Sequence, residues 1–133
     1  MNQPAEERIP ESIRRFIIEH VNSVEALETL LLLFNAPSSE WTALEVSRKL
    51  CTSVESAAAR LNELQLGKLL ITSGTDPVKY QFNAGDGSLA QIVGDLEKVY
   101  KERRVSVISL IYSKPSEPLR AFAEAFRLRK EGK

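Results

Sequence analysis

The stretch that most constrains the fold runs from Thr42 to Leu70 and reads TALEVSRKLCTSVESAAARLNELQLGKLL. Apolar residues recur at helical spacing on both sides of Cys51-Thr52-Ser53, and this pattern predicts two short helices joined by a tight turn. The first helix starts after Thr42, with Glu45 in place to complete a capping box, and Ser53 or Thr52 caps the second. The residues expected to face inward are Leu44, Val46, Leu50, Ala57, Leu61 and Leu64.

A two-stranded hairpin should follow the second of these helices. Gly67 is expected to end the helix in the left-handed conformation, after which Leu69 to Thr72 is typical of a strand. Residues 73–77 are rich in turn formers and should make the loop of the hairpin. A second, half-buried strand follows, in which polar residues alternate with Val78, Tyr80 and Phe82.

Two helices are predicted before this motif. The first begins near Pro10, because proline fits the first helical turn, and its apolar face carries Ile13, Phe16, Ile17 and Val21. The second is capped by Asn22 or Ser23, with Glu25 placed to complete a capping box from Asn22, and it runs to Phe34. Since this second helix has little polar surface, it should lie at the centre of the core.

One long helix is predicted after the hairpin, from about Asp86 to Ser113, spanning about 40 Å at the usual rise per residue. The segment Val105 to Tyr112 is rich in β-branched residues and is also compatible with a strand. A helix is favoured because no turn signal precedes it. A short last helix should carry Leu119, Phe122, Ala123 and Phe126 on one face. The chain is expected to divide into a winged-helix domain at 1–85 and a helical extension at 86–133 that completes the core or forms a dimer.

The composition is that of an ordinary globular domain, with 43% hydrophobic and 27% charged residues. The longest strictly apolar run, Leu30 to Phe34, is too short to span a membrane, and a cytoplasmic location is expected in the absence of signal-peptide features. One cysteine and one histidine cannot supply a metal site, and no phosphate-binding loop or nucleophile elbow is present. We therefore predict a non-enzymatic protein with no catalytic residue, metal or cofactor. Cys51 is expected to be a small buried residue at the turn.

The segment from Thr42 to Phe82 resembles the winged helix-turn-helix of MarR-type bacterial transcriptional regulators. The residues that carry the resemblance are Val46-Ser47, Ser53, Leu61, Leu64 and Gly67 to Leu70. The resemblance implies a mainly α (α+β) fold: a winged helix-turn-helix with a two-stranded β-wing, N-terminal flanking helices, a long C-terminal helix and a short terminal helix. The whole chain also looks like small uncharacterised bacterial winged-helix proteins.

DNA-binding members of this family carry basic and hydrogen-bonding side chains on the outer face of the second, or recognition, helix. The resemblance implies that the major groove of double-stranded DNA would be contacted by Ser56, Ala59, Arg60 and Asn62, and the phosphates by Arg48, Lys49 and Lys79. The candidates for the outer face also include Val54, Glu55 and Glu63, so that this face carries two acidic side chains and only one basic side chain, Arg60. The net charge of the chain is zero, and no global field attracts nucleic acid.

Two functions of different classes stay open on this basis. One is a DNA-binding transcriptional regulator, and the other is a winged helix that serves as a protein–protein interaction or dimerisation module without binding DNA. Exposed Val54 and Ala59 would favour the second. The position of Arg103 and Arg104 discriminates between these two functions. DNA binding is favoured if the two arginines lie on the face of the recognition helices and disfavoured if they lie on the opposite face. The last two predicted helices carry more apolar residues than one small core needs, and a homodimer would bury them.

Overall fold

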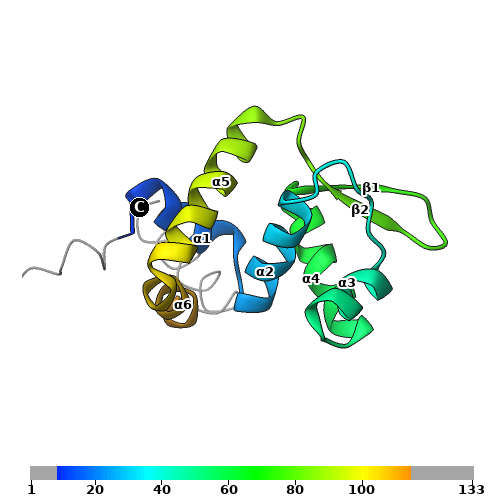
Figure 1. The fold of residues 1–133 in the computed structure, drawn as a ribbon, viewed down its shortest axis with the longest axis horizontal. Helices are drawn as coiled ribbons and strands as arrows, with labels where there is room; N and C mark the ends of the chain where they lie inside the picture. Colours follow the sequence, from blue (N-terminus) through cyan, green and yellow to red (C-terminus); the bar gives the residue numbers. More distant parts are fainter. Residues whose placement is uncertain (1–8, 115–133) are drawn as a thin grey trace, which may run out of the picture.

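The computed structural model describes residues 9–114, which form six helices and one β-hairpin (Figure 1). The elements in chain order are α1 (Glu11–His20), α2 (Val24–Phe34), α3 (Ala43–Leu50), α4 (Val54–Leu66), β1 (Leu70–Ser73), β2 (Lys79–Phe82), α5 (Gly87–Glu102) and α6 (Arg104–Ser113). The short helix predicted around Phe122 lies outside the described residues. Within residues 9–114 no helix is both long enough and apolar enough to cross a membrane.

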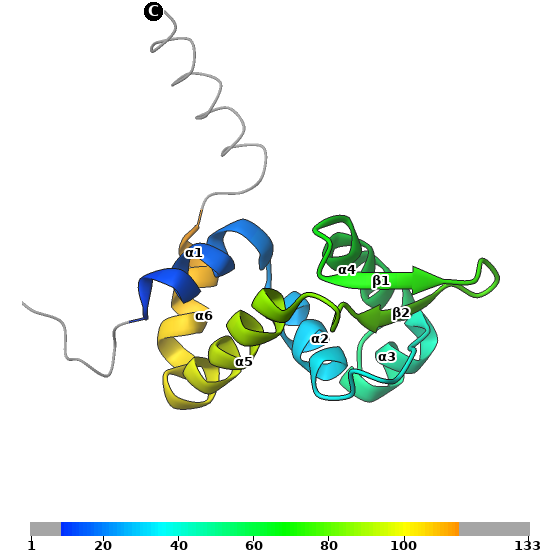
Figure 2. The same ribbon diagram turned by 90° about the horizontal axis from the view of Figure 1, so that it is seen from above.

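Helix α2 is the centre of the molecule, as its apolar sequence predicts. Leu27, Leu30 and Leu33 are fully buried. In Figures 1 and 2, α2 lies between a group formed by α1, α5 and α6 and a group formed by α3, α4 and the hairpin. Because one helix contributes to both groups, the buried residues form one continuous hydrophobic core.

Of the two residues predicted to cap α2, Asn22 and Ser23, the structure shows Ser23. Ser23 is the N-cap, and its hydroxyl accepts a hydrogen bond of 3.0 Å from the backbone N–H of Ala26. The capping box from Asn22 to Glu25 was wrong, because the Glu25 carboxylate turns toward α4 and finds side-chain partners there.

Helices α3 and α4 are joined by the predicted tight turn. The capping box of α3 is present, with Glu45 N–H donating to Thr42 Oγ1 at 3.2 Å and Thr42 N–H donating to Glu45 Oε1 at 2.9 Å. Ser53 caps α4 by accepting from Ser56 N–H at 3.0 Å. Cys51 takes the left-handed conformation at the end of α3, with φ of 57°, and is exposed. The prediction that it is buried was wrong, because the turn points its side chain outward.

The hairpin is an antiparallel pair in which Leu70 lies opposite Phe82 and Ser73 opposite Lys79. Leu70 and Phe82 are buried against the helices, whereas Ile71 on the other face is exposed. Trp41 extends the sheet by one bridge, since its N–H and C=O both pair with Tyr80 at 2.8 Å. The hairpin projects beyond α4 as the wing of the fold (Figure 2).

The left-handed residue after α4 is Lys68, with φ of 68°, and not Gly67, whose φ is −81°. Gly67 instead provides room for a neighbour. A Cβ built at this glycine would lie 3.4 Å from Nδ1 of His20. The glycine therefore allows α1 to approach the end of α4 closely.

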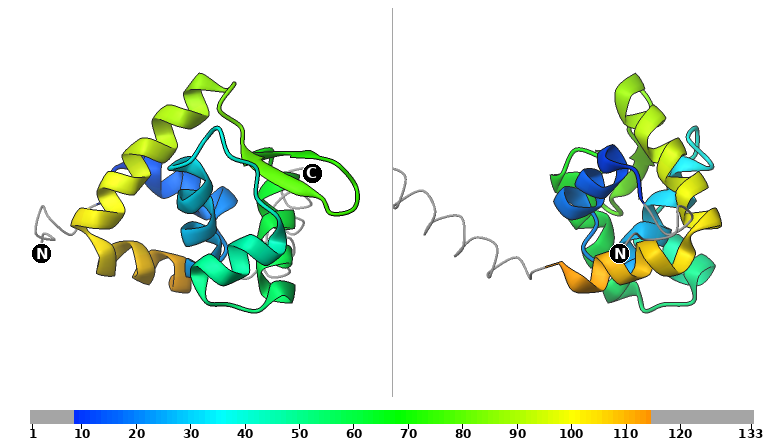
Figure 3. Two further views of the ribbon diagram at one scale, coloured as in Figure 1. Left: turned by 45° about the vertical axis from the view of Figure 1, so that its right-hand side comes forward. Right: turned by 90° about the vertical axis from the view of Figure 1, so that its left-hand side faces the viewer.

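The long C-terminal helix is interrupted, contrary to prediction. Arg103 leaves the helical conformation, with φ of −133° and ψ of 53°, and separates α5 from α6. After this break α6 folds back along the molecule (Figure 3), so that Val107, Leu110 and Ile111 are buried in the same core as α1. A straight continuation would have left these apolar side chains in solvent, and their burial favours the break. The preference for a helix at Val105 to Tyr112 was confirmed.

A lysine fastens the end of α6 to the end of α1. Lys114 Nζ donates to the carbonyl oxygens of Ile17, Ile18 and Val21 at 3.0, 2.8 and 2.8 Å, and to Asn22 Oδ1 at 3.1 Å. Carbonyls at the end of a helix lack helical partners and carry partial negative charge, so an ammonium group is favoured there.

Candidate nucleic-acid interface

The solvent-facing side of α4 is a stripe of four exposed residues, Glu55, Ala59, Asn62 and Leu66. They recur at helical spacing, opposite the buried Ala57, Leu61 and Leu64. Two of the residues predicted to face the major groove, Ala59 and Asn62, lie on this stripe. One acid, one amide and two apolar side chains therefore make up this stripe, and Val54 is exposed beside it in the first turn of α4, as predicted.

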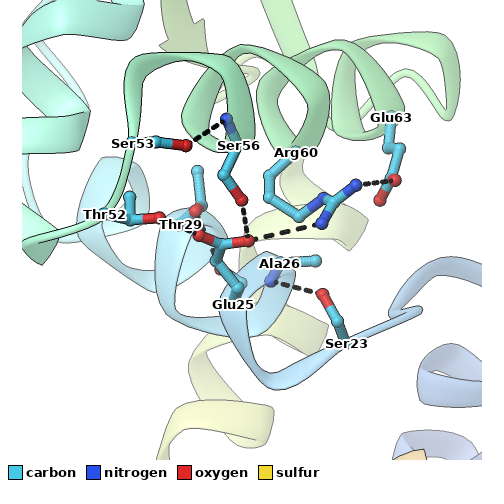
Figure 4. Close-up of polar contacts among 9 residues, drawn as sticks. All are labelled: Ser23, Glu25, Ala26, Thr29, Thr52, Ser53, Ser56, Arg60 and Glu63. Carbon is cyan, nitrogen blue, oxygen red and sulfur yellow. Dashed lines mark hydrogen bonds and ion pairs between the residues drawn. The ribbon is translucent and has the colours of Figure 1, made fainter.

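The other two predicted groove residues, Ser56 and Arg60, lie on the flank of α4 that faces α2 (Figure 4). Ser56 Oγ donates to Glu25 Oε1 at 2.6 Å, and Arg60 Nη1 lies 3.3 Å from the same oxygen. The second Glu25 oxygen accepts from Thr52 Oγ1 at 2.5 Å. The prediction that Ser56 and Arg60 face outward was therefore wrong, because Glu25 provides a buried-side partner that helical spacing alone does not reveal.

Three donors around one carboxylate favour its charged form. The pKa of Glu25 is lowered, first by the hydrogen bond from Ser56 and then by that from Thr52, with a further contribution from the Arg60 charge. These effects outweigh partial burial, which acts in the opposite direction. Glu25 thus links α2 to the turn and to the first half of α4 while it carries a negative charge.

Arg60 is shared between two carboxylates. Its Nη2 donates to Glu63 Oε2 at 2.8 Å, so that Glu25 and Glu63 both pair with one guanidinium. Arg60 Nε and Glu63 Oε1 are buried without a hydrogen-bond partner among the described residues. Glu63 was also expected to face outward, and its pairing with Arg60 holds it on the same flank.

The stability of the fold should fall in acid through Glu25. A lowered pKa means that this carboxylate stabilises the fold above its unfolded value of about 4.5 and loses that contribution as the pH falls through the folded value. Wild type should therefore exceed Glu25→Gln in free energy of unfolding at pH 7, by about 1–3 kcal/mol. Urea unfolding of both proteins at several pH values measures this difference. A difference that stays constant down to pH 3 would contradict the assignment.

The cations predicted to contact phosphates are exposed. Arg48 and Lys49 lie in the last turn of α3, and Lys79 lies at the start of β2 in the wing. Lys68, which sequence reasoning missed, is exposed at the junction of α4 and β1. None of these four side chains has a hydrogen bond or ion pair within residues 9–114. The elements adjoining α4 on either side thus present free positive charge.

Arg103 and Arg104 lie elsewhere, at the break between α5 and α6. The corner where these two helices meet is on the side of α2 away from the wing (Figure 1). Arg104 Nη2 lies 3.7 Å from Glu28 Oε2, and its guanidinium lies 4.8 Å from the centre of the Tyr100 ring. Arg103 lies 3.8 Å from Glu102. Both arginines are engaged within the helical layer and add no charge to the face of α4, so this criterion counts against DNA binding. Contacts to phosphates would then depend on the cations of α3 and the wing.

Comparison with known proteins rests on structure. No family model matches the chain, and no curated protein matches its sequence. MepR, a transcription regulator of the Staphylococcus aureus multidrug efflux pump MepA, aligns with a TM-score of 0.53 at 14% identity, over 92% of this chain and 87% of MepR. The S. aureus MepR F27L mutant bound to an oligodeoxyribonucleotide aligns with a TM-score of 0.52 at 13% identity, over 92% and 86%.

A MarR family protein from Bacillus stearothermophilus also aligns, over 91% of this chain and 82% of that protein, at 15% identity and a TM-score of 0.46. At such identities a structural match shows the fold and leaves the function to be argued from the site. The likeness to the two MepR structures therefore shows the fold, and it is the winged-helix fold predicted from the sequence.

Proposed function

We propose that the protein is a non-enzymatic transcriptional regulator that binds double-stranded DNA as a homodimer. The observation that carries this proposal is the free positive charge on the two elements beside α4. Arg48 and Lys49 on α3 and Lys79 on the wing are exposed and unpaired within the described residues, where they can contact phosphates on both sides of a groove occupied by α4. The structural likeness to MepR, of which one form was solved bound to an oligodeoxyribonucleotide, supports it.

Base recognition would depend on few side chains. The Asn62 amide can pair with the edge of adenine, and the Ala59 methyl suits the methyl group of thymine. Glu55 can accept a hydrogen bond from cytosine, but it repels nearby phosphates. We therefore infer that phosphate contacts supply most of the affinity and that discrimination between sequences is modest.

The double variant Arg48→Gln, Lys49→Gln tests which residues hold the phosphates. The slope of log K against log salt is negative, and each lost phosphate contact makes it less steep by about 0.9. The two changes should therefore reduce its steepness by about 1.8 per protomer. Fluorescence anisotropy with duplex DNA at several salt concentrations measures the slope.

The matched control is Lys98→Gln, Lys101→Gln, which removes the same charge from exposed positions on α5. The control should keep the wild-type slope. Equal losses in both double variants would show that only net charge matters and would refute the proposed interface.

The proposed dimer would bury an apolar stripe on α6. Val105 and Tyr112 lie two turns apart on this helix and are 77% and 78% exposed. Sedimentation velocity of the full chain should show a dimer, and Val105→Glu with Tyr112→Glu should convert it to a monomer, because two buried charges would have no partners. A wild-type monomer at concentrations up to about 100 μM, which would mean an interface free energy weaker than about −5.5 kcal/mol, would refute the dimer.

A protein-binding winged helix is the second candidate. Leu66 is 69% exposed on the outer stripe of α4, which also carries Glu55, and such a face suits an apolar protein partner better than a phosphate backbone. This candidate gains if the wild-type chain fails to bind duplex DNA at low salt.

A further inference from the structure

The Glu25 carboxylate occupies a cradle of three donors from two neighbouring segments. The turn before α4 supplies the Thr52 hydroxyl, and α4 supplies the Ser56 hydroxyl and the Arg60 guanidinium. Figure 4 shows these side chains around the carboxylate, with Thr52 on the left, Ser56 above and Arg60 on the right, while Glu25 comes from the first turn of α2. Hydroxyls and a guanidinium that converge in this way form an anion-binding site.

The same donors are those that proteins use to hold a phosphate group. Serine and threonine hydroxyls together with arginine account for many contacts to DNA phosphates. The cradle lies beside the N-terminus of α2, whose dipole also favours negative charge. The Glu25 carboxylate is the anion that these donors hold in the structure.

The Glu25 carboxylate lies close to solvent. The side chains of Glu25 and Arg60 are 27% and 25% exposed, so both groups of this ion pair are accessible to solvent. Arg60 also keeps its ion pair with Glu63, which would hold the guanidinium in place after Glu25 leaves.

We propose that Thr52, Ser56 and Arg60 form a phosphate-binding site that Glu25 blocks from within the chain. The carboxylate is an internal competitor, and it weakens the hold of the winged helix on any phosphate at this position. The role of the site in DNA binding rests on the proposed function. Its affinity for a free phosphate ion does not.

The first test uses inorganic phosphate alone. Glu25→Ala removes the competitor, and Glu28→Ala removes the same charge from the next turn of α2, where Glu28 faces Arg104 and Tyr100. Adding phosphate at constant ionic strength, with chloride as the balancing ion, should raise the Tm of Glu25→Ala by at least about 2 °C. Wild type and Glu28→Ala should respond less. Equal responses in all three proteins would overturn the proposal.

The second test uses duplex DNA. The slope of log K against log salt should be steeper in Glu25→Ala than in Glu28→Ala by about 0.9 per protomer, and Arg60→Gln added to Glu25→Ala should abolish the gain. If no protein binds DNA while Glu25→Ala still responds to phosphate, the proposed function fails and the site stands. If DNA is bound but the two alanine variants behave alike in both tests, the blocked site is refuted.

Glu25→Gln serves if the alanine variant does not fold. Glutamine keeps the volume of the side chain and an acceptor for the hydroxyls but loses the ion pair with Arg60, so part of the gain in salt slope should remain. A slope no steeper than that of Glu28→Gln would count against the proposal.

Discussion

Phe82→Ala should lower the free energy of unfolding by about 3–5 kcal/mol, the usual loss for a buried aromatic residue. Phe82 is 1% exposed at the end of β2, and its ring meets that of Phe34 at 5.1 Å in an edge-to-face arrangement. Phe34 in turn approaches Gly94 of α5, where a Cβ would lie 3.5 Å from its ring. The substitution therefore loosens the wing, α2 and α5 together.

Urea denaturation followed by circular dichroism measures this loss. Phe82→Leu is the control, since it keeps most of the apolar volume and should cost less than about 1.5 kcal/mol. A loss for Phe82→Ala no greater than that for Phe82→Leu would show that the aromatic contact does not join the wing to the core.

Lys114→Met should cost about 2 kcal/mol, because the three backbone carbonyls and the Asn22 amide oxygen lose one charged donor. The carbonyls lie at the end of α1, so the loss should loosen α6 from α1. Lys101→Met on α5 is the control. Lys101 is exposed and unpaired among the described residues, and its loss should change the free energy of unfolding by less than about 0.5 kcal/mol.

The pKa of His20 provides an independent test of the contact between Lys114 and the end of α1. Its pKa is lowered from the usual 6.5, first by burial and also by the Lys114 charge, while Glu19 acts in the opposite direction. Lys114→Met should therefore raise the pKa of His20, as measured by NMR titration of the one histidine in the chain. An unchanged or lower pKa in this variant would place Lys114 away from the end of α1.

The lowered pKa of His20 also affects stability. A group with this shift stabilises the fold above its unfolded value of 6.5 and loses that contribution as the pH falls through the folded value. His20 therefore adds to the acid sensitivity that Glu25 confers, but it acts at higher pH.

Periodicity and caps were enough to predict most of the fold. The capping box at Thr42 and Glu45 is local, so four residues determine it and the sequence shows all of them. The same holds for the alternation around Tyr80 that predicts β2 and for the apolar residues that place α2 in the core. These features depend on neighbours a few residues apart, whose spacing a sequence shows directly.

The missed features depend on residues far apart in the chain. Ser56 and Arg60 lie on the flank of α4, where spacing alone allows either direction, and their partner Glu25 is 31 and 35 residues away. The break at Arg103 likewise depends on the burial of α6 against α1, for which the local sequence has no glycine or proline signal. In both cases tertiary packing selected among conformations that local preferences leave nearly equal.

The proposed binding of DNA through phosphate contacts is best tested by fluorescence anisotropy of the full chain with mixed-sequence duplex DNA. Binding should be detectable at about 50 mM salt and should weaken with a slope near −2.7 per protomer for three contacts, from Arg48, Lys49 and Lys79. No binding at low salt, or binding that does not respond to salt, would contradict this account and would favour a protein partner for the exposed face of α4.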